Sequence, residues 1–499
     1  MSNDDDPTVR TRAGEVLGSW RGDSARFLGI PFAEPPVGAL RFAAPVPARA
    51  WTGVRDAREH GATPQRATLA EVTMIPEPTI PGESILNVDV FTPSPSTPAA
   101  GEPGLPVLVW IHGGGYTAGS PASPWYDGFA FNRDGVVTVS VSYRLGFDGF
   151  GYIPGAPANR GVQDWLLALE WVRDNIRAFG GDPDQVTLAG QSAGGGAVLT
   201  LLTLPRAQGL FRRVAALSGV PADIPEDHAR AVSERVAARL GVPATRDGFA
   251  SVSEADVFAA QGAPLADLPT SGIERLRALG TFAAATMLYG PVVDGDLVVT
   301  TVPDGIAAGV GADAALLVGS TRDEFTRSLA AIRDDLDPRR AVRALDILGI
   351  PARRHAAVLA AIGPETTTTI AGRVIADTLF RVPLLEIAER RGDGPTWMYD
   401  FAWRSPVSGY ALHCLDLPFF FDALAEPNVA RVAGATPPQE LADEMHGALV
   451  SFVTGGDPGW EPTGRDALAV RTFDVGATAG DPTALARALS DRPALAQTR

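Results

Sequence analysis

The stretch Val186-Thr187-Leu188-Ala189-Gly190-Gln191-Ser192-Ala193-Gly194 joins an apolar run to a serine between two glycines, and an apolar helical pattern follows as far as residue 202. The apolar run predicts a buried strand, and the pattern after it predicts a helix. Glycines suit a strained turn where side chains would clash. G-x-S-x-G alone is a weak motif, but a strand before it and a helix after it predict a nucleophile elbow, which exposes the Ser192 hydroxyl.

Strands and helices alternate along the rest of the chain. Apolar runs at 106–111, 136–141, 214–217, 314–318 and 397–401 predict further strands, and helical apolar spacing predicts helices over 162–179, 229–240 and 438–453. This alternation predicts an α/β fold with a mostly parallel central sheet flanked by helices.

The remaining segments predict no second core. We expect a single domain over 1–499, with helical insertions at roughly 222–290 and 325–375 covering the sheet and capping the site. The Pro-rich segment 92–106 predicts a surface loop between two strands. The four threonines at 366–369 predict a turn or a strand edge, with no function.

Composition and charge restrict the class of protein. The 499 residues carry a net charge of −16, so the chain repels phosphate backbones and we expect no nucleic-acid partner. The single cysteine, Cys414, excludes an intrachain disulfide. An acidic N-terminus and the lack of a long apolar run predict neither a signal peptide nor a membrane span. We therefore expect a cytoplasmic monomer or homodimer that acts on a small molecule.

A second glycine-rich motif follows the predicted strand at 106–111. His112-Gly113-Gly114-Gly115 is typical of a loop whose backbone N–H groups bind the oxyanion of a tetrahedral intermediate. The N–H groups of Gly114, Gly115 and Ala193 would form this hole, and His112 would support the loop.

A serine nucleophile needs a base, and the order Ser, acid, His places both partners after Ser192. Six histidines are available: His60, His112, His228, His355, His413 and His446. We predict that His355 is solvated in an insertion and that His446, on a helix, packs or faces solvent. His413 lies in a loop-like segment and is the predicted base. The strand at 314–318 runs into a loop that carries Asp323 and Glu324, and spacing alone does not choose between these two carboxylates.

Taken together, the motifs resemble the type-B carboxylesterase family, which includes para-nitrobenzyl esterases and cholinesterases. The resemblance spans nearly the whole chain. It rests on the two motifs above and, in order, on 29–38 (GIPFAEPPVG), Arg41-Phe42, 83–93 (ESILNVDVFTP), 143–146 (YRLG), 179–183 (FGGDP), 291–295 (PVVDG), 377–383 (DTLFRVP) and 454–458 (TGGDP). It implies an α/β-hydrolase fold and serine-dependent ester hydrolysis. No metal or organic cofactor is implied.

The resemblance also assigns roles. It makes Glu324 the acid of a Ser192–Glu324–His413 triad, and it places Gln191, Ser218 and Asp416 in a polar shell behind that triad. Two ion pairs, Arg41 with Glu83 and Arg144 with Asp164, would be structural.

Three positions depart from the family pattern. Gln191 stands where the family usually has Glu, which removes a negative charge beside the base and weakens attraction for cationic substrates. Ile85 occupies a position of the family's loop disulfide. Cys414 replaces a small residue after the histidine and is interpreted as an uncharged structural thiol.

The sequence thus predicts a serine carboxylesterase acting on neutral esters through an acyl-enzyme. An amide, carbamate or lactone hydrolase with the same triad is one alternative. A non-catalytic, cholinesterase-like interaction protein is the other, and the complete triad argues against it.

Overall fold

A computed structural model describes residues 6–64, 75–99, 101–262, 287–326, 338–392, 394–464, 468–476 and 480–490. Part of each expected insertion, 263–286 and 327–337, lies outside these ranges, as does the segment 72–74 just before Ile75. Within the described ranges, no helix is both long and apolar enough to cross a membrane.

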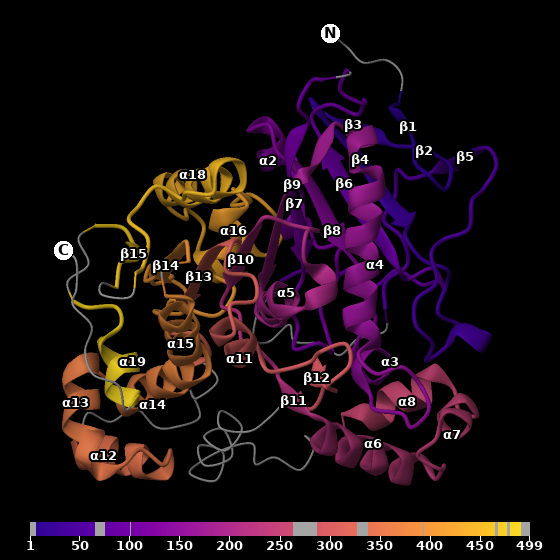
Figure 1. The fold of residues 1–499 in the computed structure, drawn as a ribbon. Coiled ribbons are helices and arrows are strands. Elements are labelled where there is room, and N and C mark those ends of the chain that lie inside the picture. Colours follow the sequence, from indigo (N-terminus) through magenta and orange to yellow (C-terminus); the bar gives the residue numbers. More distant parts are fainter. Residues whose placement is uncertain are drawn as a thin grey trace.

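A ten-stranded sheet forms the centre of the described structure (Figure 1). Its order from one edge to the other is β15 (Val470–Phe473), β14 (Thr396–Phe401), β13 (Ala315–Thr321), β10 (Arg213–Leu217), β9 (Gly181–Gln191), β7 (Leu105–Ile111), β8 (Val137–Val141), β6 (Asn87–Thr92), β4 (Ser24–Pro31) and β3 (Ser19–Arg21). The strands from β15 to β8 pair in parallel, while β6, β4 and β3 add an antiparallel edge. The predicted mostly parallel sheet is confirmed.

Two small sheets lie apart from the main one. The first pairs β1 (Thr8–Arg10), β2 (Glu15–Leu17) and β5 (Val54–Asp56), and the second pairs β11 (Ile224–Pro225) with β12 (Val292–Val293). The segment predicted as a loop at 92–106 does connect two strands, β6 and β7.

Helices surround the sheet. Their bounds are α2 (Phe129–Arg133), α3 (Gly146–Phe150), α4 (Arg160–Asn175), α5 (Ala193–Thr203), α6 (Glu226–Leu240), α7 (Arg246–Ala250), α8 (Glu254–Gln261), α11 (Val302–Ala307), α12 (Pro338–Ile347), α13 (Ala352–Ile362), α14 (Thr367–Ala376), α15 (Val382–Arg391), α16 (Leu417–Phe420), α17 (Val429–Ala433), α18 (Gln439–Gly455) and α19 (Ala484–Leu489). The described parts of the two expected insertions contain α6 to α8 and α12 to α14, which gather at one end of the molecule in Figure 1.

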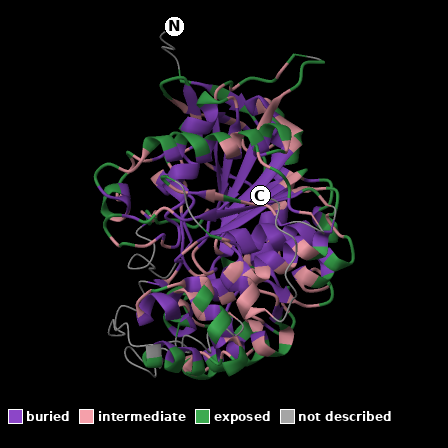
Figure 2. Cartoon of the chain, turned by 90° about the vertical axis from the view of Figure 1, so that its left-hand side faces the viewer, coloured by how far each residue is buried: buried purple, intermediate pink, exposed green. Residues whose placement is uncertain are grey.

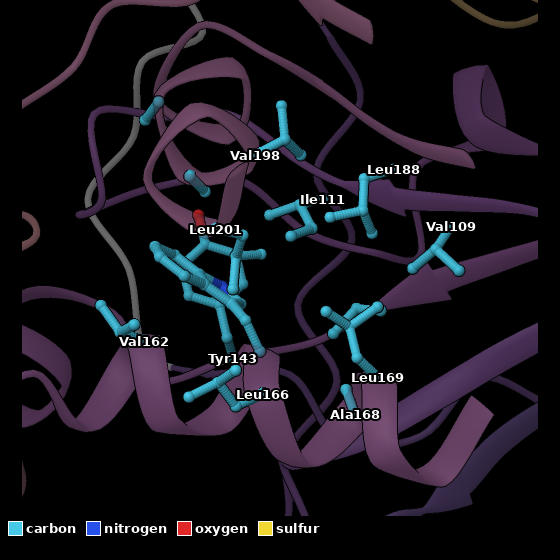
Figure 3. Packing of buried hydrophobic residues seen from close by; sticks show 14 of the residues in the cluster. Val109, Ile111, Tyr143, Val162, Leu166, Ala168, Leu169, Leu188, Val198 and Leu201 are labelled. Atoms are coloured by element: carbon cyan, nitrogen blue, oxygen red, sulfur yellow. The ribbon is translucent and has the colours of Figure 1, made fainter. Parts of the chain in front are cut away.

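The sheet is apolar on both faces because successive side chains of a strand point in opposite directions. In β7, Val109 and Ile111 join the core that α4 and α5 cover, whereas Trp110 joins the core that α16 and α18 cover. Figure 3 shows the first of these cores, with α4 side chains against the sheet. Buried residues fill the centre of Figure 2, and the helices expose their outer faces. Full burial of one such side chain contributes about 1.5–3 kcal/mol.

The four threonines do not form the predicted turn or strand edge. Thr366 is the N-cap of α14, and its hydroxyl accepts a 3.1 Å hydrogen bond from the N–H of Thr369. A threonine at this position satisfies one of the donors that every helix start leaves without a partner, and this cap outweighs the low helix propensity of the threonines after it.

Of the two expected ion pairs, only one forms. Arg144 and Asp164 make a buried pair, with Nη2 of the arginine 2.7 Å from Oδ1 of the aspartate. The Arg41–Glu83 pair is a wrong prediction: Glu83 is exposed, and Arg41 instead lies 3.8 Å from Asp148 and donates to the carbonyl of Val252. The presence of another carboxylate, on α3, within reach of Arg41 explains the difference.

Candidate active site

The turn between β9 and α5 holds Ser192 in a strained conformation. Its φ of 58° and ψ of −122° lie outside the regions favoured by residues with a side chain. A Cβ on Gly194 would lie 2.0 Å from the carbonyl oxygen of Ile111, so the helix start approaches β7 too closely for any other residue. The fold thus places Ser192 at the end of the strand and at the start of α5, as an elbow requires.

The glycine-rich loop after β7 lies beside this serine. A Cβ on Gly113 would be 3.0 Å from the Cβ of Ser192, and Gly114 has a φ of 116°. Ala193 is the first residue of α5, where backbone N–H groups have no partner within the helix. The glycine-rich loop therefore approaches Ser192 close to the start of α5.

His112 holds this loop in place through a polar contact and a ring contact. Its Nδ1 lies 2.8 Å from the carbonyl oxygen of Gly113, and its ring stacks on that of Tyr143 with centroids 4.7 Å apart. The Tyr143 hydroxyl in turn donates a 3.0 Å hydrogen bond to the carbonyl oxygen of His112.

Glu324 and His413 are in direct contact. Oε2 of Glu324 is hydrogen-bonded to Nδ1 of His413, and both side chains are buried. Asp323, the alternative carboxylate, faces away and bonds Arg373 and the N–H of Ala411. The geometry therefore selects Glu324 as the carboxylate at the histidine.

Several groups act on the charge of His413. Burial opposes the imidazolium, but the hydrogen-bonded Glu324 carboxylate favours it, and the pKa of His413 is raised well above 6.5. Burial raises the pKa of the Cys414 thiol, in keeping with an uncharged structural group.

The other nitrogen of His413 contacts Gln191. Nε2 of the imidazole lies 3.2 Å from Nε2 of the Gln191 amide. In the neutral imidazole Glu324 accepts the Nδ1 proton, so Nε2 carries the lone pair and accepts from the amide. Among the described residues, no hydrogen bond links the Ser192 hydroxyl to His413; the structure joins the acid to the base, and the base to Gln191, the residue before the serine.

Two further polar residues of the expected shell lie near the acid. The Ser218 hydroxyl donates a 2.8 Å hydrogen bond to Oε1 of Glu324. Asp416 is fully buried and accepts a 2.9 Å hydrogen bond from the Tyr399 hydroxyl. Burial raises the pKa of Asp416 to about 7, and the nearby Glu324 carboxylate adds to this.

Two phenylalanines that the sequence did not single out flank the base. The ring centroids of Phe325 and Phe380 lie 4.5 Å and 5.2 Å from that of His413. Phe380 lies in a π-helical turn, Asp377–Arg381, between α14 and α15. The sequence could have pointed to Phe325, because this residue directly follows Glu324. It could not have placed Phe380 beside His413, because a π-helical turn has no characteristic spacing of apolar residues.

The other late histidines have structural partners. His355 is buried, and its Nε2 lies 2.8 Å from the carbonyl oxygen of Ile350, so the prediction of a solvated side chain is wrong. Residues of α12, α14 and α19 pack against α13 and bury one of its faces. His446 packs inside, with Nδ1 2.8 Å from the carbonyl oxygen of Phe420. In the described ranges, no cluster of three or more His, Cys, Asp or Glu side chains could hold a metal ion.

The sheet order, the elbow after β9 and the glycine-rich loop after β7 define an α/β-hydrolase. Comparison with known proteins is more specific. Residues 5–350 match the model of the carboxylesterase family, and the chain belongs to this family. It is a carboxylic ester hydrolase.

Two curated relatives and one solved structure illustrate the similarity. The chain is 32% identical to the para-nitrobenzyl esterase of Bacillus subtilis, over 91% of either chain. It is 33% identical to the fumonisin B1 esterase of Sphingopyxis macrogoltabida, over 91% of this chain and 83% of that protein. A crystal structure of a carboxylesterase from Geobacillus stearothermophilus superposes with a TM-score of 0.81 and 31% identity, covering 97% of this chain and 100% of the other.

Proposed function

We propose that the protein is a serine carboxylesterase that cleaves neutral carboxylic esters through an acyl-enzyme, with Ser192 as nucleophile, His413 as base and Glu324 as the acid that orients it. The observation that carries this proposal is the contact between Glu324 Oε2 and His413 Nδ1, on a histidine that also contacts Gln191, the residue before the elbow serine. That contact fixes the tautomer in which Nε2 accepts a proton.

The first half of the reaction forms the acyl-enzyme. The Ser192 oxygen attacks the ester carbonyl carbon, and its proton passes to Nε2 of His413. The N–H groups of Gly114, Gly115 and Ala193 bind the negative oxygen of the tetrahedral intermediate. The C–O bond to the alcohol then breaks, and the alcohol leaves with the proton from Nε2.

The second half repeats these steps with water. His413 takes a proton from water, the resulting hydroxide attacks the acyl carbon, and collapse of the intermediate returns the proton to the Ser192 oxygen and releases the acid. The Gln191 amide must leave Nε2 before either proton transfer. Hydrogen bonds of catalytic groups often become short and well aligned only when substrate is bound.

Replacement of the nucleophile tests the proposal. Ser192→Ala should lower kcat for a short-chain nitrophenyl ester by several orders of magnitude, because loss of a triad member commonly has this effect. It should also abolish labelling by a fluorophosphonate, measured as the mass added to the intact protein. Ser451→Ala, on the exposed side of α18, is the matched control and should keep both. Activity of Ser192→Ala above about 1% of wild type would overturn the assignment.

The acid has its own test. Glu324→Gln should lower kcat by roughly 10³- to 10⁴-fold, because the imidazole loses the anion that orients it.

The class of substrate is tested on the wild-type protein with matched ester, amide, carbamate and lactone substrates. A higher kcat/KM for the amide, carbamate or lactone than for the ester would replace the esterase assignment by the alternative.

A further inference from the structure

Asp323 joins the loop of the acid to the loop of the base. Its backbone N–H donates a 2.9 Å hydrogen bond to the carbonyl oxygen of Ala411, and its carboxylate Oδ2 accepts a 2.9 Å hydrogen bond from the N–H of the same residue. The Asp323 side chain is fully buried. One residue therefore satisfies both backbone groups of a residue two positions before His413.

These bonds continue toward the reacting groups. The N–H of His413 donates a 3.0 Å hydrogen bond to the carbonyl oxygen of Glu324, and Glu324 and Leu412 form an isolated parallel bridge. The two loops are therefore in register from Asp323 to His413. Glu324 has a φ of 21° and Cys414 one of 67°, so both loops bend sharply at this point, beyond the ends of β13 and β14.

Two arginines balance the charge of Asp323. Nε of Arg373, on α14, donates a 2.9 Å hydrogen bond to Oδ1, and Nε of Arg404 lies 3.8 Å from Oδ2. Glu365 in turn bonds Nη2 of Arg404 at 2.9 Å. A buried carboxylate without such partners would be strongly unfavourable.

We propose that Asp323 is a positioning residue: it sets the distance and angle between Glu324 and His413 by holding the two loops in register, while Arg373 balances the charge of its carboxylate. The inference rests on the proposed triad. Displacement of a catalytic group by about 1 Å can lower a rate by about 10²-fold. A shift of the two loops relative to each other should therefore lower kcat even though every reacting group is still present.

Four variants separate this role from a contribution to folding alone. Asp323→Ala removes the acceptor for Ala411 and the acceptor for Nε of Arg373, although Glu365 still lies 3.8 Å from Nη2 of that arginine. Asp323→Asn keeps an oxygen for Ala411 but turns an amide toward Arg373, and Asp323→Asn/Arg373→Met removes that arginine as well. Arg391→Met is the control, because this buried arginine bonds Thr396 and the carbonyl of Gly311, away from both loops.

Each variant would be assayed for kcat, KM, melting temperature and the low-field proton resonance of the Nδ1–H···Glu324 hydrogen bond. We expect Asp323→Ala to lower kcat by about 10²-fold with little change in KM and to shift or broaden the resonance. Asp323→Asn/Arg373→Met should recover at least about tenfold of that loss. Arg391→Met should lower the melting temperature but change kcat by less than about twofold and leave the resonance in place.

Two results would overturn the proposal. One is a kcat of folded Asp323→Ala within about twofold of wild type; the other is a double variant no more active than Asp323→Ala. If Asp323→Ala does not fold, Asp323→Asn/Arg373→Met provides the test. A kcat about 10²-fold below that of wild type, with an unchanged Nδ1–H resonance of His413, would also refute a positioning role. Failure of the triad itself is distinguishable, because Ser192→Ala would then remain active.

Discussion

The Ser218 hydroxyl donates a 2.8 Å hydrogen bond to Oε1 of Glu324, while the other oxygen of that carboxylate bonds His413. The N–H of Thr321 donates a second hydrogen bond to Oε1, at 2.9 Å. Ser218 follows β10 and Thr321 ends β13, and these two strands are paired neighbours in the sheet. The central sheet thus fixes one oxygen of the acid and leaves the other for the base.

Ser218→Ala removes one of the two donors to Oε1. We expect kcat to fall by about tenfold, because a hydrogen bond to a charged group contributes about 1.5–3 kcal/mol and Thr321 still holds the carboxylate. Steady-state kinetics on a nitrophenyl ester measure the effect. Ser218→Thr, which retains the hydroxyl, is the control, and a kcat of Ser218→Ala equal to that of wild type would show that Thr321 alone orients Glu324.

The pKa of His413 predicts the acid limb of the pH profile. Only the neutral imidazole can take a proton from Ser192, so kcat/KM should be constant above this pKa and fall about tenfold per pH unit below it. Because the pKa is raised above 6.5, the fall should begin at a higher pH than for an unperturbed histidine. Glu324→Gln removes the carboxylate that raises it and should move the limb to lower pH. A wild-type limb centred below 6.5 would contradict this prediction.

The elbow and the glycine-rich loop were predictable because both need backbone geometries that only glycine permits. A Cβ on Gly194 or on Gly114 would collide with a backbone carbonyl, so these close contacts require glycine, and the glycines are visible in the sequence. The strands were predictable for a similar reason, since burial on both faces leaves continuous apolar runs such as 106–111.

Contacts between side chains that are distant in the sequence leave no pattern in the sequence comparable to the glycine motifs or the apolar runs. Arg41 pairs with Asp148 on α3 and not with Glu83, a choice that only the packing of the loops decides. Spacing did not separate Asp323 from Glu324 either, since the two are adjacent and face opposite sides of one turn. The contact between Gln191 and His413 also requires the folded positions of two residues 222 apart in sequence.

Asp416 predicts how stability depends on pH. Its pKa rises from 3.8 to about 7 on folding, so the folded state holds a proton that the unfolded state releases. The contribution to stability is complete below pH 3.8 and is lost as the pH rises to about 7. Asp416→Asn does not titrate and keeps an oxygen for the Tyr399 hydroxyl. Its unfolding free energy relative to wild type should therefore increase by about 3 kcal/mol from pH 5 to pH 8, which melting temperatures at the two pH values would detect. A constant difference across this range would show that Asp416 ionises normally.

The last prediction concerns the charge of the substrate. Gln191 places a neutral amide 3.2 Å from the base, where the family usually has a carboxylate, and the rings of Phe325 and Phe380 flank the same imidazole. No aromatic residue occurs in 72–78, the segment before Glu83, to bind a quaternary ammonium by its ring face. The net charge of −16 attracts cations to the surface, but salt screens this effect over about 8 Å, and it creates no pocket.

We therefore expect neutral esters with an apolar acyl or alcohol part to be preferred. The test compares kcat/KM for butyrylcholine and for an isosteric uncharged butyrate ester at physiological salt. Wild type should favour the uncharged ester, and Gln191→Glu should shift the ratio toward the choline ester by about three- to tenfold, because a carboxylate near the reacting carbon attracts the ammonium group. A wild-type preference for butyrylcholine would refute the prediction and would mean that Phe325, Phe380 or another aromatic or acidic group already binds the cation.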